Sequence, residues 1–140
     1  MAEVHNVIRT GIYTRLTGAT NTFKTAVYKS AKYPGLYYNI ANTGETLPYT
    51  VFDILPINPS LDSASKFYEC LIQFNVAHTT LGGCETIAGY LNDRLDDSLS
   101  ALSFTGYSAL RFDRRPEIPL GIIDNVWNII VQYGLYLEKN

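Results

Sequence analysis

Hydrophobic residues at the start of the chain recur every three or four positions, which is the spacing of one face of an α-helix. Polar residues between them, including Arg9 and Arg15, then lie on the opposite face. The pattern predicts an amphipathic helix over residues 2–16 that ends near Gly18. The apolar face of this helix comprises Val4, Val7, Ile8, Gly11, Ile12 and Leu16.

A second, shorter helix is predicted after this one. Asn21 is a good N-cap residue, and Phe23, Ala26 and Val27 have the spacing of a core-facing side. The Tyr-Pro-Gly sequence at 33–35 ends the helical region, because proline disfavours helix in the residue before it and glycine favours a turn.

The next stretch changes from helical spacing to strand composition. GLYYNIAN (35–42) predicts a strand and NTGE (42–45) a turn, followed by the strongly apolar strand LPYTVFDIL (47–55). Proline is tolerated near a strand's start and end, as at Pro48 and Pro56. We take the following residues of this strand as the framework of the fold: Pro48, Tyr49, Phe52 and Ile54. A polar loop is expected over 56–65.

The second half of the chain alternates between the two periods. Residues 66–78 alternate apolar and mixed positions like a strand, 83–99 have helical spacing, and 101–114 return to strand composition. RPEIP (115–119) reads as an exposed connection, and 125–137 as a long terminal strand. One face of that strand carries Trp127, Ile129, Val131, Tyr133 and Leu135.

This order of elements indicates an α+β fold. Strands adjacent in sequence and joined by short polar loops favour a mostly antiparallel sheet of about five strands, with two or three helices packed on one face. At 140 residues the chain is expected to form a single domain, residues 1–140.

Charge and composition restrict the classes of function. A net charge of −2 and a pI near 5.6 argue against nonspecific nucleic-acid binding, which depends on many Lys and Arg side chains. No apolar run approaches the roughly 20 residues of a membrane span, and the start of the chain lacks a signal-peptide pattern. We therefore expect the protein in the cytoplasm, with Cys70 and Cys84 as free thiols.

The sequence contains no recognisable catalytic or metal-binding motif. His5 and His78 are far apart, and neither they nor the two cysteines have metal-ligand spacing, so no cofactor is expected. A nucleophile, base and orienter could in principle come from Cys84, His78 and Glu85, although ordinary structural roles in a strand end and a helix start explain these residues better. The two glycines of LGGCET match no phosphate-binding motif.

The densest charge lies in RFDRRPEIP. Its charged residues are Arg111, Asp113, Arg114, Arg115 and Glu117. Three interpretations are open: a solvated loop, a loop that faces DNA, or a subunit contact in which arginines pair with carboxylates of a neighbouring copy. The carboxylates suggested for that contact lie on the predicted helix 83–99, at Asp93, Asp96 and Asp97. Eleven tyrosines also suit protein interfaces, although tyrosine is equally a good strand former.

The chain resembles the phage tail-completion or tail-terminator (head-tail joining) family. The resemblance spans nearly the whole chain and is carried by the first helix, by GLYYNIANTGETLPYTVFDIL and FYECLIQFNVAHTT, and by the following helix and strand pair. Its most specific part is Leu47, Pro48 and Tyr49 with the β run that follows them. The longer segment NTFKTAVYKSAKYP and the connection TGETLPY depart from the family's pattern and leave the subgroup open.

The resemblance implies a structural, non-enzymatic protein of the virion. It implies a ring, usually of six copies, at the head-proximal end of the tail tube, which stops tube polymerisation and docks the head connector. The partners are then other copies, the tail tube protein and the head-completion or connector protein, with DNA only passing through the lumen and no membrane. Localisation is the host cytoplasm during assembly and then the virion. The alternatives are another head-tail adaptor or minor tail protein, and a small α+β enzyme or ligand-binding domain.

Overall fold

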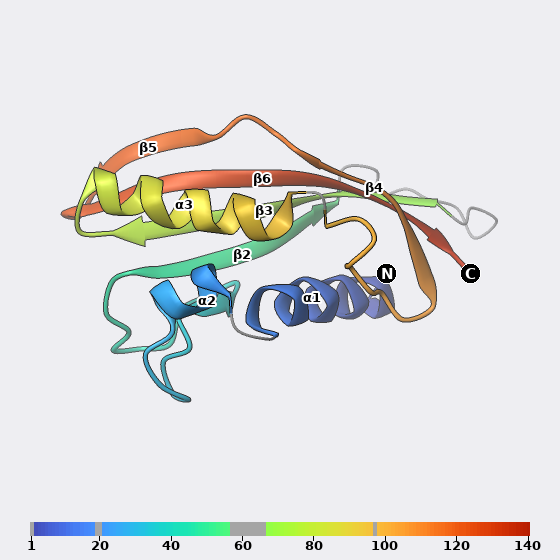
Figure 1. Cartoon of the computed structure of the whole chain (residues 1–140), viewed down its shortest axis with the longest axis horizontal. Helices are drawn as coiled ribbons and strands as arrows, with labels where there is room; N and C mark the ends of the chain where they lie inside the picture. The colour runs from blue at the N-terminus through green and yellow to red at the C-terminus, as the bar shows by residue number, and fades with distance from the viewer. Residues whose placement is uncertain (1, 19–20, 57–66, 97) are drawn as a thin grey trace.

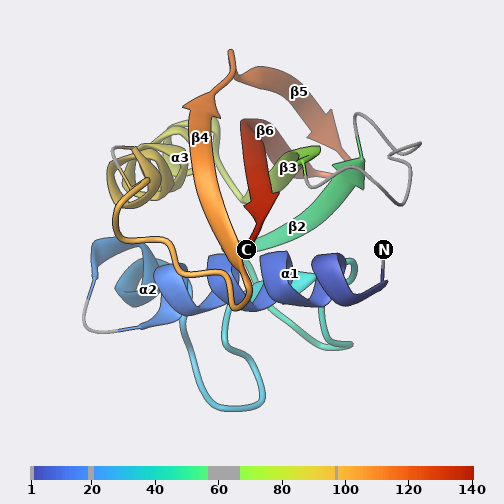
Figure 2. The ribbon, with the colours of Figure 1, turned by 90° about the vertical axis from the view of Figure 1, so that its right-hand side faces the viewer.

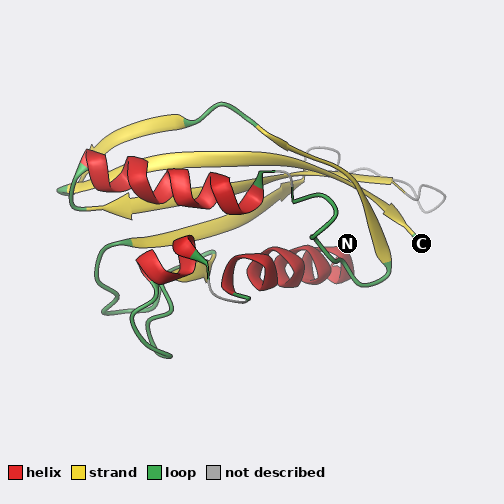
Figure 3. Ribbon diagram, in the orientation of Figure 1, coloured by secondary structure: helices red, strands yellow, loops and turns green. Residues whose placement is uncertain are grey.

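The computed structural model describes residues 2–18, 21–56, 67–96 and 98–140, and these form three helices and a six-stranded sheet (Figures 1 and 3). The fold is α+β, as predicted. The helices are α1 (Ala2–Thr17), α2 (Thr22–Val27) and α3 (Leu81–Leu95). The strands are β1 (Leu36–Tyr38), β2 (Tyr49–Pro56), β3 (Phe67–His78), β4 (Tyr107–Arg114), β5 (Ile118–Ile123) and β6 (Val126–Lys139).

Strands β3 and β6 form the centre of the sheet. The order is β1-β2-β3-β6-β4, and β5 also pairs with β6. All pairs are antiparallel except β1 with β2, which are parallel. The parallel pair departs from the expected antiparallel arrangement. After β1 the chain returns to the end of the sheet at which β1 began, so that β2 runs in the same direction.

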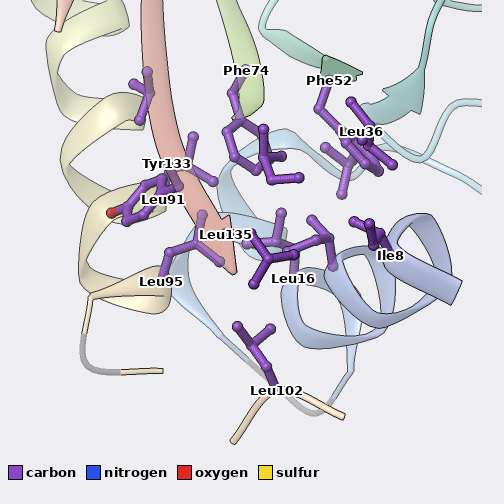
Figure 4. Packing of buried hydrophobic residues seen from close by; sticks show 14 of the residues in the cluster. Ile8, Leu16, Leu36, Phe52, Phe74, Leu91, Leu95, Leu102, Tyr133 and Leu135 are labelled. Atoms are coloured by element: carbon purple, nitrogen blue, oxygen red, sulfur yellow. The ribbon is translucent and has the colours of Figure 1, made fainter. Parts of the chain in front are cut away.

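The helices cover one face of the sheet, which we call the inner face (Figure 1). Because side chains alternate along a strand, Phe52, Phe74 and Val131 point to this face from β2, β3 and β6. These three side chains are fully buried, and Figure 4 shows Phe52 and Phe74 on the side that faces Ile8 and Leu16 of α1. The predicted stripe is largely confirmed, with these buried residues on α1: Val4, Ile8, Ile12 and Leu16.

Strands β4 and β5 together form the first arm of a long hairpin, and β6 forms the second arm. β4 pairs with the second half of β6 and β5 with its first half, on the edge opposite β3. Between them, the Arg115 N–H still donates to the Gln132 carbonyl at 2.8 Å. The two-residue turn is Asp124–Asn125, with φ of 52° and 65°, the left-handed conformation that a twisted hairpin requires.

Several predicted boundaries change. The exposed connection at 115–119 is wrong at its end, because Ile118 and Pro119 belong to β5, which the sequence did not predict. Helix α3 begins at Leu81, capped by the Thr80 side chain, and ends at Leu95 rather than near residue 99. Strand β2 begins at Tyr49, so Pro48 precedes it. The polar loop predicted from residue 56 lies, after Pro56, outside the described residues.

The second helix and the two long strands are as predicted. Asn21 caps α2 by accepting from the Lys24 N–H at 2.9 Å, and Phe23 and Val27 are buried. Gly35, in the Tyr-Pro-Gly turn, has φ of 81°, and a Cβ there would lie 2.1 Å from the Val27 carbonyl oxygen. Any residue with a Cβ would clash with this oxygen, so only glycine lets the chain pass this close to the end of α2.

Candidate interaction surface

The arginine-rich segment and the end of α3 lie against each other within one copy. Arg114 Nη2 is 3.6 Å from Asp96 Oδ2, and Asn92 Nδ2 donates to Glu117 Oε1 at 2.8 Å. The predicted pairing of arginine with the acidic helix is therefore found inside the chain, which argues against Asp96 as the carboxylate of a neighbouring copy.

Tyr133 connects this charged cluster to the core. Its hydroxyl lies 2.8 Å from Asp96 Oδ1 and 2.9 Å from Asn92 Oδ1, while its ring stacks on Phe112 with centroids 4.7 Å apart. Burial, followed by the hydrogen bond to the Asp96 carboxylate, raises the pKa of Tyr133 well above its ordinary value. The hydroxyl is therefore a neutral donor that orients the end of α3.

The remaining charges of the segment point to other places. Asp93 is exposed on α3 and Asp97 lies outside the described residues. Arg111 forms an exposed ion pair with Asp113, at 2.6 Å, and its guanidinium lies 5.2 Å from the centroid of the Tyr136 ring. The segment is thus divided between the two faces of the sheet and does not form one charged loop.

Arg115 lies on the outer face, which is the face of the sheet opposite the helices. A Cβ at Gly134 would lie 2.5 Å from Arg115 Nη2, so the guanidinium crosses β6 where glycine leaves space. Nη2 also donates to the Tyr136 hydroxyl at 3.5 Å. This position packs Arg115 against its own sheet.

The edge strand β5 exposes several large aliphatic side chains. Ile118, Leu120, Ile122 and Ile123 are between 44% and 56% exposed. Exposed apolar residues that follow one another along an edge are typical of interaction sites. The sequence signal was the apolar run 119–123, which has no strand alternation because Pro119 and Gly121 interrupt it.

Two prolines limit how β5 can be approached. Pro116 stands between β4 and β5, and Pro119 lies within β5. Neither residue has an N–H to donate to an added strand. The row of backbone donors along this edge is therefore incomplete, while its side chains remain available to a partner.

The framework strand β2 has two different faces. Phe52 and Ile54 are buried in the core, whereas Tyr49 is partly exposed on the outer face and Leu55 is 42% exposed. Burial in the core therefore explains the apolar residues on one face of this strand but not those on the other face.

The outer face contains a polar hollow of about 480 Å³. Its floor includes Asp53 of β2, Gln73 and Asn75 of β3, and Asn128 of β6. Burial raises the pKa of Asp53, and among the described residues its carboxylate has no hydrogen-bond or ion-pair partner. Asn75 Oδ1 is also buried without a donor. The hollow therefore presents an unpartnered carboxylate, with a second unsatisfied acceptor buried beside it.

An ion pair with a buried carboxylate holds the loop that forms one wall of the hollow. Glu45, whose side chain is 1% exposed, accepts from Lys29 Nζ at 3.1 Å, from the Thr46 N–H at 2.8 Å and from the Tyr37 hydroxyl. Burial raises the pKa of Glu45, but these donors outweigh it and leave the pKa below its ordinary value. The loop also carries Ile40, which is 78% exposed at the hollow.

The residues considered for catalysis have structural roles. Cys84 is buried at the start of α3 and its Sγ donates to the Trp127 carbonyl at 3.0 Å. Burial raises the pKa of Cys84 and raises that of Cys70 to about 12, which disfavours the nucleophilic thiolate. His78 Nδ1 accepts from the Thr79 N–H at 2.8 Å.

Residues 2–18, 21–56, 67–96 and 98–140 contain no group of three or more His, Cys, Asp or Glu side chains that is arranged to hold a metal ion. In the same residues, no helix is long and apolar enough to cross a membrane.

Comparison with known proteins gives likeness in fold without likeness in sequence. No family model matches the chain, and no curated protein matches it. A chain of the solved virion of a native gene transfer agent particle superposes with a TM-score of 0.73 at 11% identity, covering 96% of this chain and 97% of that one. A second solved structure superposes with a TM-score of 0.61 at 14% identity, covering 96% and 95%. The chain therefore has the fold of a protein found in a virion.

Proposed function

We propose that this protein is a structural component of a phage virion and acts as a tail terminator. In this role several copies, six as in the family that the sequence resembles, form a ring at the head-proximal end of the tail tube. The ring stops addition of tube subunits and offers a docking surface to the head connector. The protein would assemble in the host cytoplasm and remain at the head-tail interface of the virion.

The observation that carries the proposal is the fold shared with a virion chain over nearly the full length of both proteins. The covered fractions, 96% and 97%, mean that the whole fold is shared and not a common substructure. Fold alone does not define function, so the argument also needs a surface suited to assembly.

The exposed aliphatic edge β5 supports assembly with other protein chains. Its partners in the proposal are neighbouring copies, the tail tube protein and the head-completion protein, with DNA passing only through the lumen. Head-to-tail contacts that close into a ring leave two different ring faces. A terminator needs that difference, because one face binds the tube while the other must not extend it.

The test is electron microscopy of particles assembled with and without this chain. Overlong tails, or tails without heads, are expected when the chain is absent, and adding the purified protein should restore normal length and joining. Tails of normal length that fail to join heads would instead favour another head-tail adaptor. Normal particles in its absence would refute both roles.

A further inference from the structure

The polar hollow on the outer face has the chemistry of a site for a cationic side chain. The Asp53 carboxylate lines the hollow and has no partner in the described part of the chain, and Asn75 Oδ1 is buried beside it without a donor. A guanidinium group, which carries several N–H donors and a positive charge, can pair with the Asp53 carboxylate. Its aliphatic stem would pack on the apolar parts of the lining, Ile40 and Val51.

The same chain carries a suitable arginine at the opposite edge of the sheet. Arg111 is on β4, the strand at the far end of the order from β1 and β2. Arg111 pairs with Tyr136 of β6, and Asp53 pairs with Gln73 of β3. Both partners lie on the outer face, so Arg111 and the hollow are on the same face of the sheet. A register shift between Ala109 and Arg111 displaces the edge here, and bulges of this kind re-aim side chains. The Arg111 side chain is 66% exposed.

We propose that Arg111 of one copy enters the hollow of a second copy and pairs with Asp53 there. This inference rests on the proposed function, because it identifies the contact between neighbours in the ring. The β4 edge of one copy then meets the β1–β2 edge of the next, and the outer faces of the two sheets are continuous. This is a head-to-tail contact, which can close into a ring. Arg111 would leave an ion pair with Asp113 in which both side chains are partly exposed, and such pairs contribute little, for the Asp53 carboxylate, which has no partner within one copy.

An exposed apolar side chain lies beside each partner of the proposed ion pair. Ile40 stands exposed at the hollow, while Leu110 lies exposed next to Arg111. An apolar contact that surrounds an ion pair excludes water from it and strengthens it.

The experiment is a charge exchange measured by sedimentation velocity and by counting copies on tails in electron micrographs. Asp53→Arg and Arg111→Asp should each weaken association about ten-fold or more, because each places like charges at the contact. The double variant restores opposite charges with the positions exchanged, and it should recover most of the association. Glu85→Arg, at an exposed position of α3 on the other side of the sheet, makes the same charge change as Asp53→Arg and serves as control; it should associate like wild type.

The neutral variant Asp53→Asn separates an interface role from a structural one. It removes a desolvated charge, so the monomer should melt at a higher temperature while association weakens. Wild-type association of Asp53→Arg, equal loss in the control, or no recovery in the double variant would each overturn the inference. Loss with Asp53→Arg but not with Arg111→Asp would also overturn it, because the cation then comes from another protein. If wild type assembles neither in solution nor on tails, the proposed function fails as well; if it forms the ring and the variants behave like it, only the inference fails.

Discussion

The hydroxyl of Tyr133, at the centre of β6, lies 2.8 Å from the carboxylate of Asp96 at the C-cap of α3. This hydrogen bond joins the central strand to the end of a helix that is far from it in sequence. We expect Tyr133→Phe to lower the free energy of unfolding by about 2 kcal/mol, since the ring stays but partly buried acceptors lose their donor. Urea denaturation measures this change. Tyr136→Phe is the control, because the Tyr136 hydroxyl has only a long contact with Arg115, and a loss as large there would contradict the assignment.

Stability should fall in alkaline solution. The pKa values of Tyr37 and Tyr133 are both raised in the folded protein, by burial first and then by their hydrogen bonds to Glu45 and Asp96. The folded state thus holds these protons more tightly than the unfolded chain. Their contribution is complete below the ordinary tyrosine pKa of about 10 and is lost as the pH rises above it. Melting temperatures from about pH 8 to about pH 11 test this, and Tyr133→Phe should reduce the alkaline loss.

The ion pair at Glu45 should stabilise the wall of the hollow. Glu45→Gln removes the charge that Lys29 binds, and we expect a loss of about 2 kcal/mol. Because the pKa of Glu45 is lowered in the fold, its contribution in wild type is present above its ordinary pKa, about 4.3, and disappears as the pH falls below it. Thermal melts across this range should show a weaker acid dependence for the variant. An unchanged acid dependence would show that other carboxylates dominate.

The edge β5 should matter for assembly and little for folding. Ile122 is 56% exposed, so Ile122→Lys should change the free energy of unfolding by less than about 0.5 kcal/mol. The charge should nevertheless reduce the number of copies on assembled tails. Phe52→Ala is the contrasting variant, because Phe52 is fully buried and its truncation should cost about 4 kcal/mol. Normal assembly of Ile122→Lys would remove β5 from the interface.

The turn between β5 and β6 should tolerate glycine but not a branched residue. Asn125 has φ of 65°, which asparagine and glycine adopt readily and valine does not. Asn125→Val should destabilise the protein by about 1–3 kcal/mol, whereas Asn125→Gly should be close to neutral. Chemical denaturation of both variants gives the comparison, and equal stability would show that the hairpin can change its turn.

Periodic segments were predictable from sequence because their pattern and their burial agree. The alternation around Phe74 and Val131 and the helical stripe around Ile12 match the buried faces of β3, β6 and α1. Strand β5 was not predictable in this way: Pro119 and Gly121 break the alternation, and the strand exists because β6 provides a partner along its whole length.

The site was predictable in its residue types but not in its geometry. Arginine and carboxylate at Arg114 and Asp96 do pair, but within one chain, because α3 packs beside β6 and brings its end to β4. The hollow was missed because Asp53 and Asn75 each look like one polar residue in an apolar strand. Only the register between β2 and β3 shows that they share a face.

Pro116 and Pro119 have a consequence for the free protein before it assembles. An uncovered strand next to exposed isoleucines is a template for uncontrolled strand addition and aggregation. The missing N–H groups interrupt that template, so copies made in excess resist joining into fibres through backbone pairing. Before assembly the edge therefore resists aggregation, while its side chains stay available for a specific contact.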